Sequence, residues 1–264
     1  MSNHSPLMTV MVAAARKAGR ALIRDFGELE NLQVSRKGPA DFVTRADLKA
    51  EETLFAELSK ARPGYGFLGE ERGDVPGTDK THRWIVDPID GTLNFMHGMP
   101  HFAISVGLER ESQLIAGIVY NPVRDELFWA EKGRGAWLNA RRLRVSARRT
   151  LAEGVIATGI PFLGKPGHAQ FLKELHQIAG KTAGVRRFGS AALDLAWVAA
   201  GRFDAFWERD LKLWDIAAGV VLVREAGGLC QEIDGADFME TGSILAGSDV
   251  MVPLVSERLA AARG

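Results

Sequence analysis

Only one cysteine, Cys230, occurs in the sequence. One thiol cannot close a disulfide within the chain, and it cannot build a cysteine-based zinc cluster. Proteins without disulfides are typical of reducing compartments. We therefore expect a cytoplasmic protein.

Net charge and long apolar runs are lacking as well. The 33 lysine and arginine residues balance the 33 aspartate and glutamate residues, so the overall charge favours neither nucleic acid nor an anionic membrane. No apolar run approaches the roughly 18 residues that would cross a membrane. Residues 7–15 form an apolar patch, but no positive region precedes it and its periodicity continues into Arg16 and Lys17, so we do not interpret it as a signal peptide.

The composition is that of an ordinary globular protein. Hydrophobic residues make up 46% and charged residues 25% of 264 positions, which is enough to bury a substantial core. In the first half, helical periodicity runs from Leu7 to Phe26 and from Ala46 to Leu58. Runs of β-branched and aromatic residues between polar turns predict strands that include an antiparallel meander. These runs are residues 64–68, 84–86, 102–109, 114–120 and 126–130, with 143–146 as a candidate edge strand.

The second half alternates strands with helices, which predicts an α/β layered arrangement. The expected strands are residues 155–157, 185–188, 203–207, 229–233 and 244–246, and the expected helices are residues 168–179, 191–200, 215–226 and 251–262. We expect one domain over residues 1–264, with an α+β subdomain of roughly residues 1–150 and an α/β subdomain of roughly residues 151–264.

The stretch of residues 84–95 holds the first candidate site. A buried strand is expected to end at Asp87, where Pro88 fixes the backbone, and Asp90-Gly91 follows as a turn. Two carboxylates three residues apart resist ionising side by side unless a cation lies between them. Asp87 and Asp90 therefore predict a metal site.

Glu70 and Asp215 occur in a similar setting, where a strand or loop gives way to a turn or to the start of a helix. Functional groups of α/β proteins gather at the carboxyl ends of strands. Oxygen ligands without cysteine or a histidine cluster favour Mg²⁺, Mn²⁺ or Ca²⁺ over zinc, and Mg²⁺ fits phosphoryl transfer. Either acid taken alone could instead cap a helix or lie in solvent.

A phosphate site is predicted next to these acids. The glycine before a helix start in Gly91-Thr92 exposes backbone N–H groups that can bind an anion. Thr92 could also be no more than the N-cap of that helix. Asp47 follows Thr44 at the spacing of a capping box, so its functional interpretation requires Thr92 to lie nearby in the fold.

Two further features are interpreted more simply. His97 and His101 flank a Gly-Met-Pro loop and are typical loop residues rather than a metal pair. A basic run could contact RNA, although a solvated edge is the simpler interpretation. This run comprises Arg141, Arg142, Arg144, Arg148 and Arg149.

Four ordered blocks of the sequence resemble the inositol monophosphatase family, whose members are magnesium-dependent, lithium-sensitive phosphatases. The blocks are residues 41–47 (Asp-Phe-Val-Thr-Arg-Ala-Asp), 67–71 (Phe-Leu-Gly-Glu-Glu), 84–95 (Trp-Ile-Val-Asp-Pro-Ile-Asp-Gly-Thr-Leu-Asn-Phe) and 213–219 (Leu-Trp-Asp-Ile-Ala-Ala-Gly). The resemblance extends from the first helix to the last. It implies an α+β fold, a layered αβαβα sandwich of the sugar-phosphatase type, and a homodimer.

The resemblance also implies a set of metal ligands. Glu70, Asp87 and the carbonyl of Ile89 would hold one Mg²⁺, and Asp87, Asp90 and Asp215 would hold a second. A third, weaker ion would be held by Glu70. Mn²⁺ is expected to substitute for Mg²⁺, and Li⁺ and Ca²⁺ are expected to inhibit.

Catalytic and substrate-binding roles follow from the same resemblance. Thr92 with Asp47 would orient and deprotonate the attacking water, and Glu70 would complete the catalytic set. Backbone N–H groups of Gly91 and Thr92 would bind the phosphate. The hydroxyl groups of the substrate would contact Asp90, Ala191 and Glu208, against a wall shaped by Gly189 and Ser190.

We therefore predict an enzyme, a magnesium-dependent phosphomonoesterase that hydrolyses inositol monophosphate to inositol and phosphate. Leu93 favours the inositol phosphatase branch, since nucleotidase relatives typically carry lysine there and histidinol-phosphatase relatives often carry arginine. Ile160 and Leu213 depart from common family residues near the substrate wall or the loop of the second metal, so the substrate range stays open. The alternatives are fructose-1,6-bisphosphatase or another sugar or nucleotide phosphatase, and an RNA- or transcription-associated binding protein that retains the fold.

Overall fold

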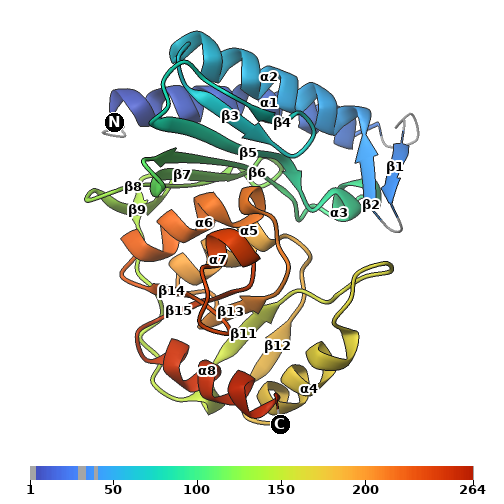
Figure 1. Ribbon diagram of the computed structural model, residues 1–264, viewed down its shortest axis with the longest axis vertical. Helices are drawn as coiled ribbons and strands as arrows, with labels where there is room; N and C mark the ends of the chain where they lie inside the picture. Colours follow the sequence, from blue (N-terminus) through green and yellow to red (C-terminus); the bar gives the residue numbers. More distant parts are fainter. Residues whose placement is uncertain (1–3, 29–33, 39–40, 264) are drawn as a thin grey trace.

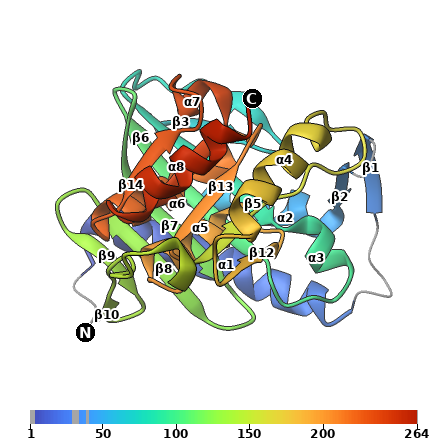
Figure 2. The same cartoon turned by 90° about the horizontal axis from the view of Figure 1, so that it is seen from below.

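The computed structural model, which describes residues 4–28, 34–38 and 41–263, stacks its helices and sheets in five layers (Figure 1). From the top of Figure 1 these are a helix pair, an eight-stranded sheet, a second helix pair, a five-stranded sheet and a third helix pair. Figure 2 shows the third pair from below, in front of the five-stranded sheet. This order confirms the predicted αβαβα sandwich. The pairs are α1 (Pro6–Phe26) with α2 (Arg45–Ala61), α5 (Ala191–Ala199) with α6 (Leu213–Glu225), and α4 (His168–Ala179) with α8 (Met251–Ala261).

The eight-stranded sheet contains the predicted meander. Its neighbouring strands pair antiparallel, apart from β3 and β5, which are parallel. In spatial order the strands are β10 (Arg141–Arg142), β9 (Gly135–Leu138), β8 (Glu126–Glu131), β7 (Gln113–Asn121), β6 (Ala103–Arg110), β5 (His82–Asp90), β3 (Gly66–Gly69) and β4 (Gly73–Val75). Because β3 and β5 are parallel neighbours, the residues that follow them emerge at one edge of the sheet.

The five-stranded sheet is mixed. β11 lies parallel to β12 and β13, whereas β15 runs antiparallel to β13 and β14. In spatial order the strands are β12 (Gly184–Arg186), β11 (Val155–Thr158), β13 (Ala205–Glu208), β15 (Ile244–Gly247) and β14 (Leu229–Glu232). The remaining short elements are the ribbon of β1 (Val34–Gly38) and β2 (Asp41–Thr44), α3 (Thr92–Met96), a 3₁₀ turn at Leu151–Glu153 and α7 (Phe238–Thr241).

Helix α6 fixes the distance between the two sheets. Every residue from Ile216 to Val223 is buried, as expected for a helix covered on all sides. Its backbone lies directly on β7, because a Cβ atom at Gly117 would come within 2.6 Å of the Ala218 carbonyl oxygen. This close approach places the first turn of α6, with Asp215, beside the ends of β5 and β6.

The predicted edge strand at residues 143–146 is wrong. The edge strand is β10, Arg141–Arg142, which pairs with β9. Leu143 still donates its N–H to the Ala136 carbonyl, but Val145 donates to the carbonyl of Ala226 in the second half of the chain. The alternating apolar residues therefore mark a crossover between the layers rather than a strand.

No helix within the described residues is both long and apolar enough to cross a membrane.

Candidate active site

A β-bulge at the end of β5 brings Asp87 and Asp90 to the same side. The prediction that the strand ends at Asp87 is wrong, since β5 continues through Pro88 to Asp90. Asp87 pairs with Ser105 and Asp90 with Ala103, so two residues of β5 lie opposite one residue of β6. In a regular strand, side chains three positions apart point to opposite faces, and the extra residue of the bulge reverses this.

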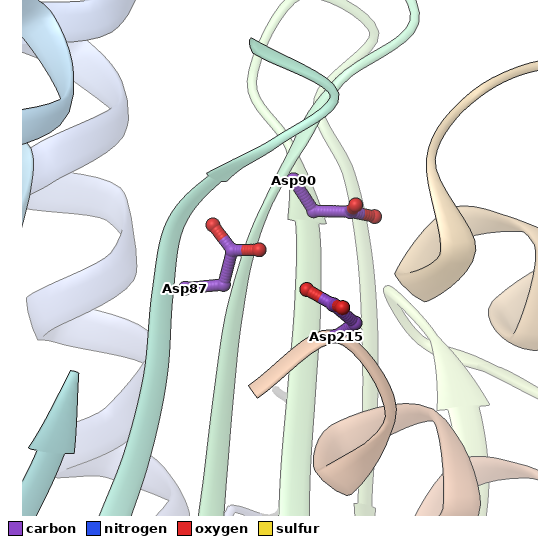
Figure 3. A group of neighbouring side chains, drawn as sticks. All are labelled: Asp87, Asp90 and Asp215. Atoms are coloured by element: carbon purple, nitrogen blue, oxygen red, sulfur yellow. The ribbon is translucent and has the colours of Figure 1, made fainter. Parts of the chain in front are cut away.

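Asp215 completes an acidic triad with these two residues. Figure 3 shows Asp87 and Asp90 at the end of β5 facing Asp215 at the start of α6. Each of the three offers one carboxylate oxygen, and these oxygens lie within 4.8 Å of one another. Asp215 Oδ2 accepts the N–H of Lys212 at 2.7 Å, which fixes the orientation of the side chain.

Electrostatically, this triad suits a bound cation. Burial, followed by the nearby carboxylates of Glu70 and Asp90, raises the pKa of Asp87 well above its ordinary value. Burial and then Asp90 raise the pKa of Asp215 in the same way. Carboxylates held this close to one another cannot all ionise without a compensating positive charge. The donor set is entirely oxygen, which fits Mg²⁺ better than zinc.

Asp90 is held by the N-terminus of α5. Its Oδ2 accepts the Ser190 hydroxyl and the Ala192 N–H, the latter at 2.7 Å. Burial raises the pKa of Asp90 to about 6, although the hydrogen bonds from Ser190 and from the N–H groups of Ala192 and Ala191 favour the charged form. Ser190 and Ala191 are thus near Asp90 as expected, but their donors already serve a protein carboxylate.

Glu70 and Ile89 line the same cavity as the triad. Glu70 follows β3, whose carboxyl end lies beside that of β5, and its charge contributes to the raised pKa of Asp87. Ile89 donates its N–H to Asp87 Oδ1 at 2.9 Å, while its carbonyl oxygen lies 3.0 Å from the Thr92 hydroxyl. The structure thus brings all five predicted ligands to one place.

Asp47 lies next to Thr92 and also closes a capping box. Asp47 Oδ1 is 3.1 Å from the Thr92 hydroxyl, and Oδ2 accepts the N–H of Thr44 at 2.8 Å. Only 1% of Asp47 is exposed, and this burial raises its pKa to about 6. Asp47 therefore caps helix α2, as predicted, and it also lies close to Thr92, as a functional role would require.

Gly91 occupies the N-cap of the short helix α3. Its φ of +99° is in the left-handed region that favours glycine, and Thr92 is the first helical residue. The alternative in which Thr92 is only the N-cap is therefore wrong. Gly91 and Thr92 line a cavity of about 420 Å³ that is also lined by Gly189, Ser190 and Glu208. Small-molecule sites commonly have this size.

Several residues of the cavity were missed by the sequence interpretation. Lys165, Arg187 and Lys212 place three cationic side chains in the lining, which suits an anionic substrate. Asp194 also lines it, and burial raises its pKa well above the ordinary value. Arg187 lies two residues before Gly189, and Lys212 directly precedes the 213–219 block, so their proximity to those segments was the available signal. His97 and His101 do not line this cavity.

Asn94 joins the two walls of the cavity and was also missed. Its Nδ2 donates to the carbonyl oxygens of His101 at 2.7 Å and Phe188 at 2.8 Å. His101 belongs to the segment that follows α3, whereas Phe188 directly precedes Gly189. One buried amide therefore links the segment after α3 to the segment that contains Gly189.

The basic run lies apart from this cavity lining. The five arginines are exposed, Arg142 lies over the Trp137 ring, and Arg148 forms an ion pair with buried Asp204 at 3.2 Å. The run therefore comprises the edge strand β10 and part of the crossover that follows it. Its exposure agrees with the interpretation of a solvated edge.

Comparison with known proteins gives one consistent family. The model of the inositol monophosphatase family matches residues 3–263. An inositol-1-monophosphatase of Caulobacter vibrioides is 64% identical over 96% of this chain and 100% of its own length. A protein of Pseudomonas aeruginosa named Nus factor SuhB is 45% identical over 92% of each chain. The crystal structure of the extragenic suppressor protein suhB of Bartonella henselae, 55% identical, covers 97% of this chain and 98% of its own with a TM-score of 0.94.

The match over nearly the whole length identifies the family: this chain belongs to the inositol monophosphatase family.

Proposed function

We propose that this chain is a magnesium-dependent phosphomonoesterase that hydrolyses inositol monophosphate to inositol and phosphate. The observation that carries the proposal is the triad of Asp87, Asp90 and Asp215, which lines one cavity together with Gly91 and Thr92 at the start of α3. The name of the relative that is 64% identical supports the choice of substrate. Fructose-1,6-bisphosphate and other sugar or nucleotide phosphates remain the alternatives within the same chemistry.

The metal would be held by Glu70, Asp87, the Ile89 carbonyl, Asp90 and Asp215. When bound, two or three Mg²⁺ ions would neutralise charge on the phosphate and lower the pKa of water. Mn²⁺ as a substitute, Li⁺ and Ca²⁺ as inhibitors, a homodimer and a single domain over residues 1–264 also belong to this proposal. The close packing of α6 between the two sheets supports the single domain.

The remaining residues bind the substrate and orient the attacking water. The N–H groups at Gly91 and Thr92 bind the phosphate, aided by the cationic side chains of the cavity. The Thr92 hydroxyl orients the attacking water and the Asp47 carboxylate accepts its proton, with the 3.1 Å contact between them keeping the pair aligned. Glu70 completes the catalytic set. Glu208, Asp90 and the Gly189–Ala191 segment form the wall for the substrate hydroxyl groups.

The test is phosphate release from a panel of substrates by wild type, Asp87→Asn and Asp74→Asn. Asp87→Asn removes one charge of the triad and should abolish Mg²⁺-dependent release while leaving the fold intact. Asp74, an exposed residue of β4, provides a matched control that should keep full activity. The panel contains inositol monophosphate, fructose 1,6-bisphosphate and a nucleotide 3′-phosphate, with and without Li⁺. Near-normal turnover by Asp87→Asn would refute the proposal.

A second candidate function is binding of RNA or of the transcription machinery by the same fold. The name of the relative that is 45% identical, Nus factor SuhB, supports it, and the exposed arginines at residues 141–149 offer cationic groups. Filter binding of RNA over a salt series tests it, since phosphate contacts weaken as salt rises. Binding that is absent at physiological ionic strength would eliminate this candidate.

A further inference from the structure

Three side chains of helix α2 lie on one face of the helix. Asp47, Glu51 and Phe55 are spaced by four residues, so they lie above one another, about 6 Å apart along the helix axis. Asp47 contacts Thr92, whereas Phe55 lies beneath the guanidinium of Arg72, 4.2 Å from the ring centroid. Glu51, between them, faces the loop that carries Glu70.

Glu51 binds the backbone directly after Glu70. Its Oε2 accepts the N–H of Glu71 at 2.8 Å, and the N–H of Arg72 is a second donor to the same carboxylate. Only 2% of Glu51 is exposed, and burial raises its pKa above the ordinary value. Burying a carboxylate costs free energy that an apolar residue at this position would not. A purely structural need for α2 to pack is therefore a poor explanation of this glutamate.

Gly69 shows that the Glu51 carboxylate also packs against the backbone directly before Glu70. A Cβ atom at Gly69 would overlap Glu51 Oε2 and would come within 2.7 Å of the Phe67 ring. Glu70 therefore lies between two residues that contact Glu51. On one side the Glu51 carboxylate fills the space of a Gly69 side chain, and on the other it accepts the N–H of Glu71. The carboxylate of Glu51 contacts both sides of the turn.

We propose that Glu51 is a positioning residue, which holds the peptide groups on both sides of Glu70 so that the Glu70 carboxylate faces Asp87 and the metal. The inference rests on the proposed function, because it takes Glu70 as a metal ligand. It also gives α2 a defined role: Asp47 and Glu51, one helical turn apart, fix the position of Thr92 relative to that of Glu70.

The test measures Mg²⁺ binding to the metal-stripped full-length protein by calorimetry, together with the Mg²⁺ concentration that gives half-maximal phosphate release. Glu51→Ala removes the acceptor and should weaken Mg²⁺ binding by about 10- to 100-fold, as loss of groups that orient metal ligands typically does. Glu51→Gln keeps an oxygen for the N–H groups and should stay within about threefold of wild type, because the proposed role requires the acceptor and not the charge. Glu52→Ala, at the exposed neighbouring position of α2, should bind like wild type.

Gly69→Ala approaches the same contact from the other side. Its methyl group should displace Glu51 and weaken Mg²⁺ binding about tenfold. Thermal unfolding of every variant separates loss of folding from loss of binding. If Glu51→Ala does not fold, the Mg²⁺ affinities of Gly69→Ala and Glu51→Gln test the proposal. Wild-type affinity in a folded Glu51→Ala or in Gly69→Ala would overturn the proposal, as would a Glu51→Gln that binds as weakly as Glu51→Ala. A wild-type protein without Mg²⁺ binding or Mg²⁺-dependent release would instead refute the proposed function.

Discussion

Glu208→Gln is predicted to make the metal-free protein more stable, by an amount that grows as pH rises from about 4.5 to 7. Glu208 lines the cavity, and within the described part of the chain its carboxylate accepts no hydrogen bond. Burial, followed by the nearby Asp90 carboxylate, raises its pKa to about 7 from an ordinary 4.5. Because one pKa unit corresponds to about 1.4 kcal/mol, ionised Glu208 destabilises the fold by about 3 kcal/mol.

The sign of this effect depends on pH. A group whose pKa is raised in the folded state stabilises the fold below its unfolded pKa and loses that stabilisation as pH rises through the folded value. Wild type should therefore lose stability between about pH 4.5 and 7, whereas Glu208→Gln should lose less. For a chain of this size, 3 kcal/mol corresponds to roughly 6–12 °C in Tm.

The measurement is calorimetric unfolding with a chelator at pH 5 and pH 8, with Glu52→Gln as an exposed control that should match wild type at both values. A rise in Tm for Glu208→Gln that is equal at both pH values, or a lower Tm than wild type at pH 8, would refute this electrostatic explanation. Phosphate release should fall through a higher KM, because the amide replaces a charged acceptor for a substrate hydroxyl.

Two further predictions concern the cavity walls. Gly91→Ala places a side chain at a φ of +99° with its methyl 3.1 Å from the His101 carbonyl, so we expect a loss of about 2 kcal/mol in the free energy of unfolding, and phosphate release at least tenfold slower. Gly73→Ala has a similar positive φ but open space around the new methyl, so urea unfolding and assays of both variants separate backbone strain from damage to the site. Asn94→Ala leaves the carbonyls of His101 and Phe188 without their donor, and should cost about 2 kcal/mol and raise KM more than it lowers kcat. A KM for Asn94→Ala equal to that of wild type would mean that the two walls keep their positions without this amide.

Periodicity predicted most of the helices and strands, whereas the order of the layers and the full set of acidic ligands came from the family resemblance of four sequence blocks. The stripes from Leu7 to Phe26 and from Ala46 to Leu58 became α1 and α2, because an amphipathic helix has one way to bury its apolar side. Asp87 and Asp90 could be predicted as a metal site from their spacing around Pro88, whereas Asp215 was assigned as a ligand only through the family resemblance.

Contacts between distant segments could not be predicted from local patterns. The β-bulge that aligns Asp87 with Asp90 depends on pairing with β6, which residues 84–95 do not encode by themselves. The bonds from Asn94 to Phe188 and from Ser190 to Asp90 likewise join segments that lie about 100 residues apart in the sequence. Glu51 did leave a trace, since it follows Asp47 by four residues and lies beside the apolar stripe of α2, where a charged residue is unusual.

The bond from Ser190 to Asp90 has a consequence for how the protein is made. The donor is synthesised 100 residues after the acceptor, and helix α6 is made later still. While the chain grows from its N-terminus, the eight-stranded sheet can form before α6 exists to cover its inner face, so apolar surface around Gly117 is exposed to the cell. A ribosome-bound fragment that ends before residue 190 would thus expose the apolar face of the eight-stranded sheet. It would also lack the donors, Ser190 and Ala192, that bind the Asp90 carboxylate. Chaperone binding to nascent chains should peak in this interval and end once α6 is released.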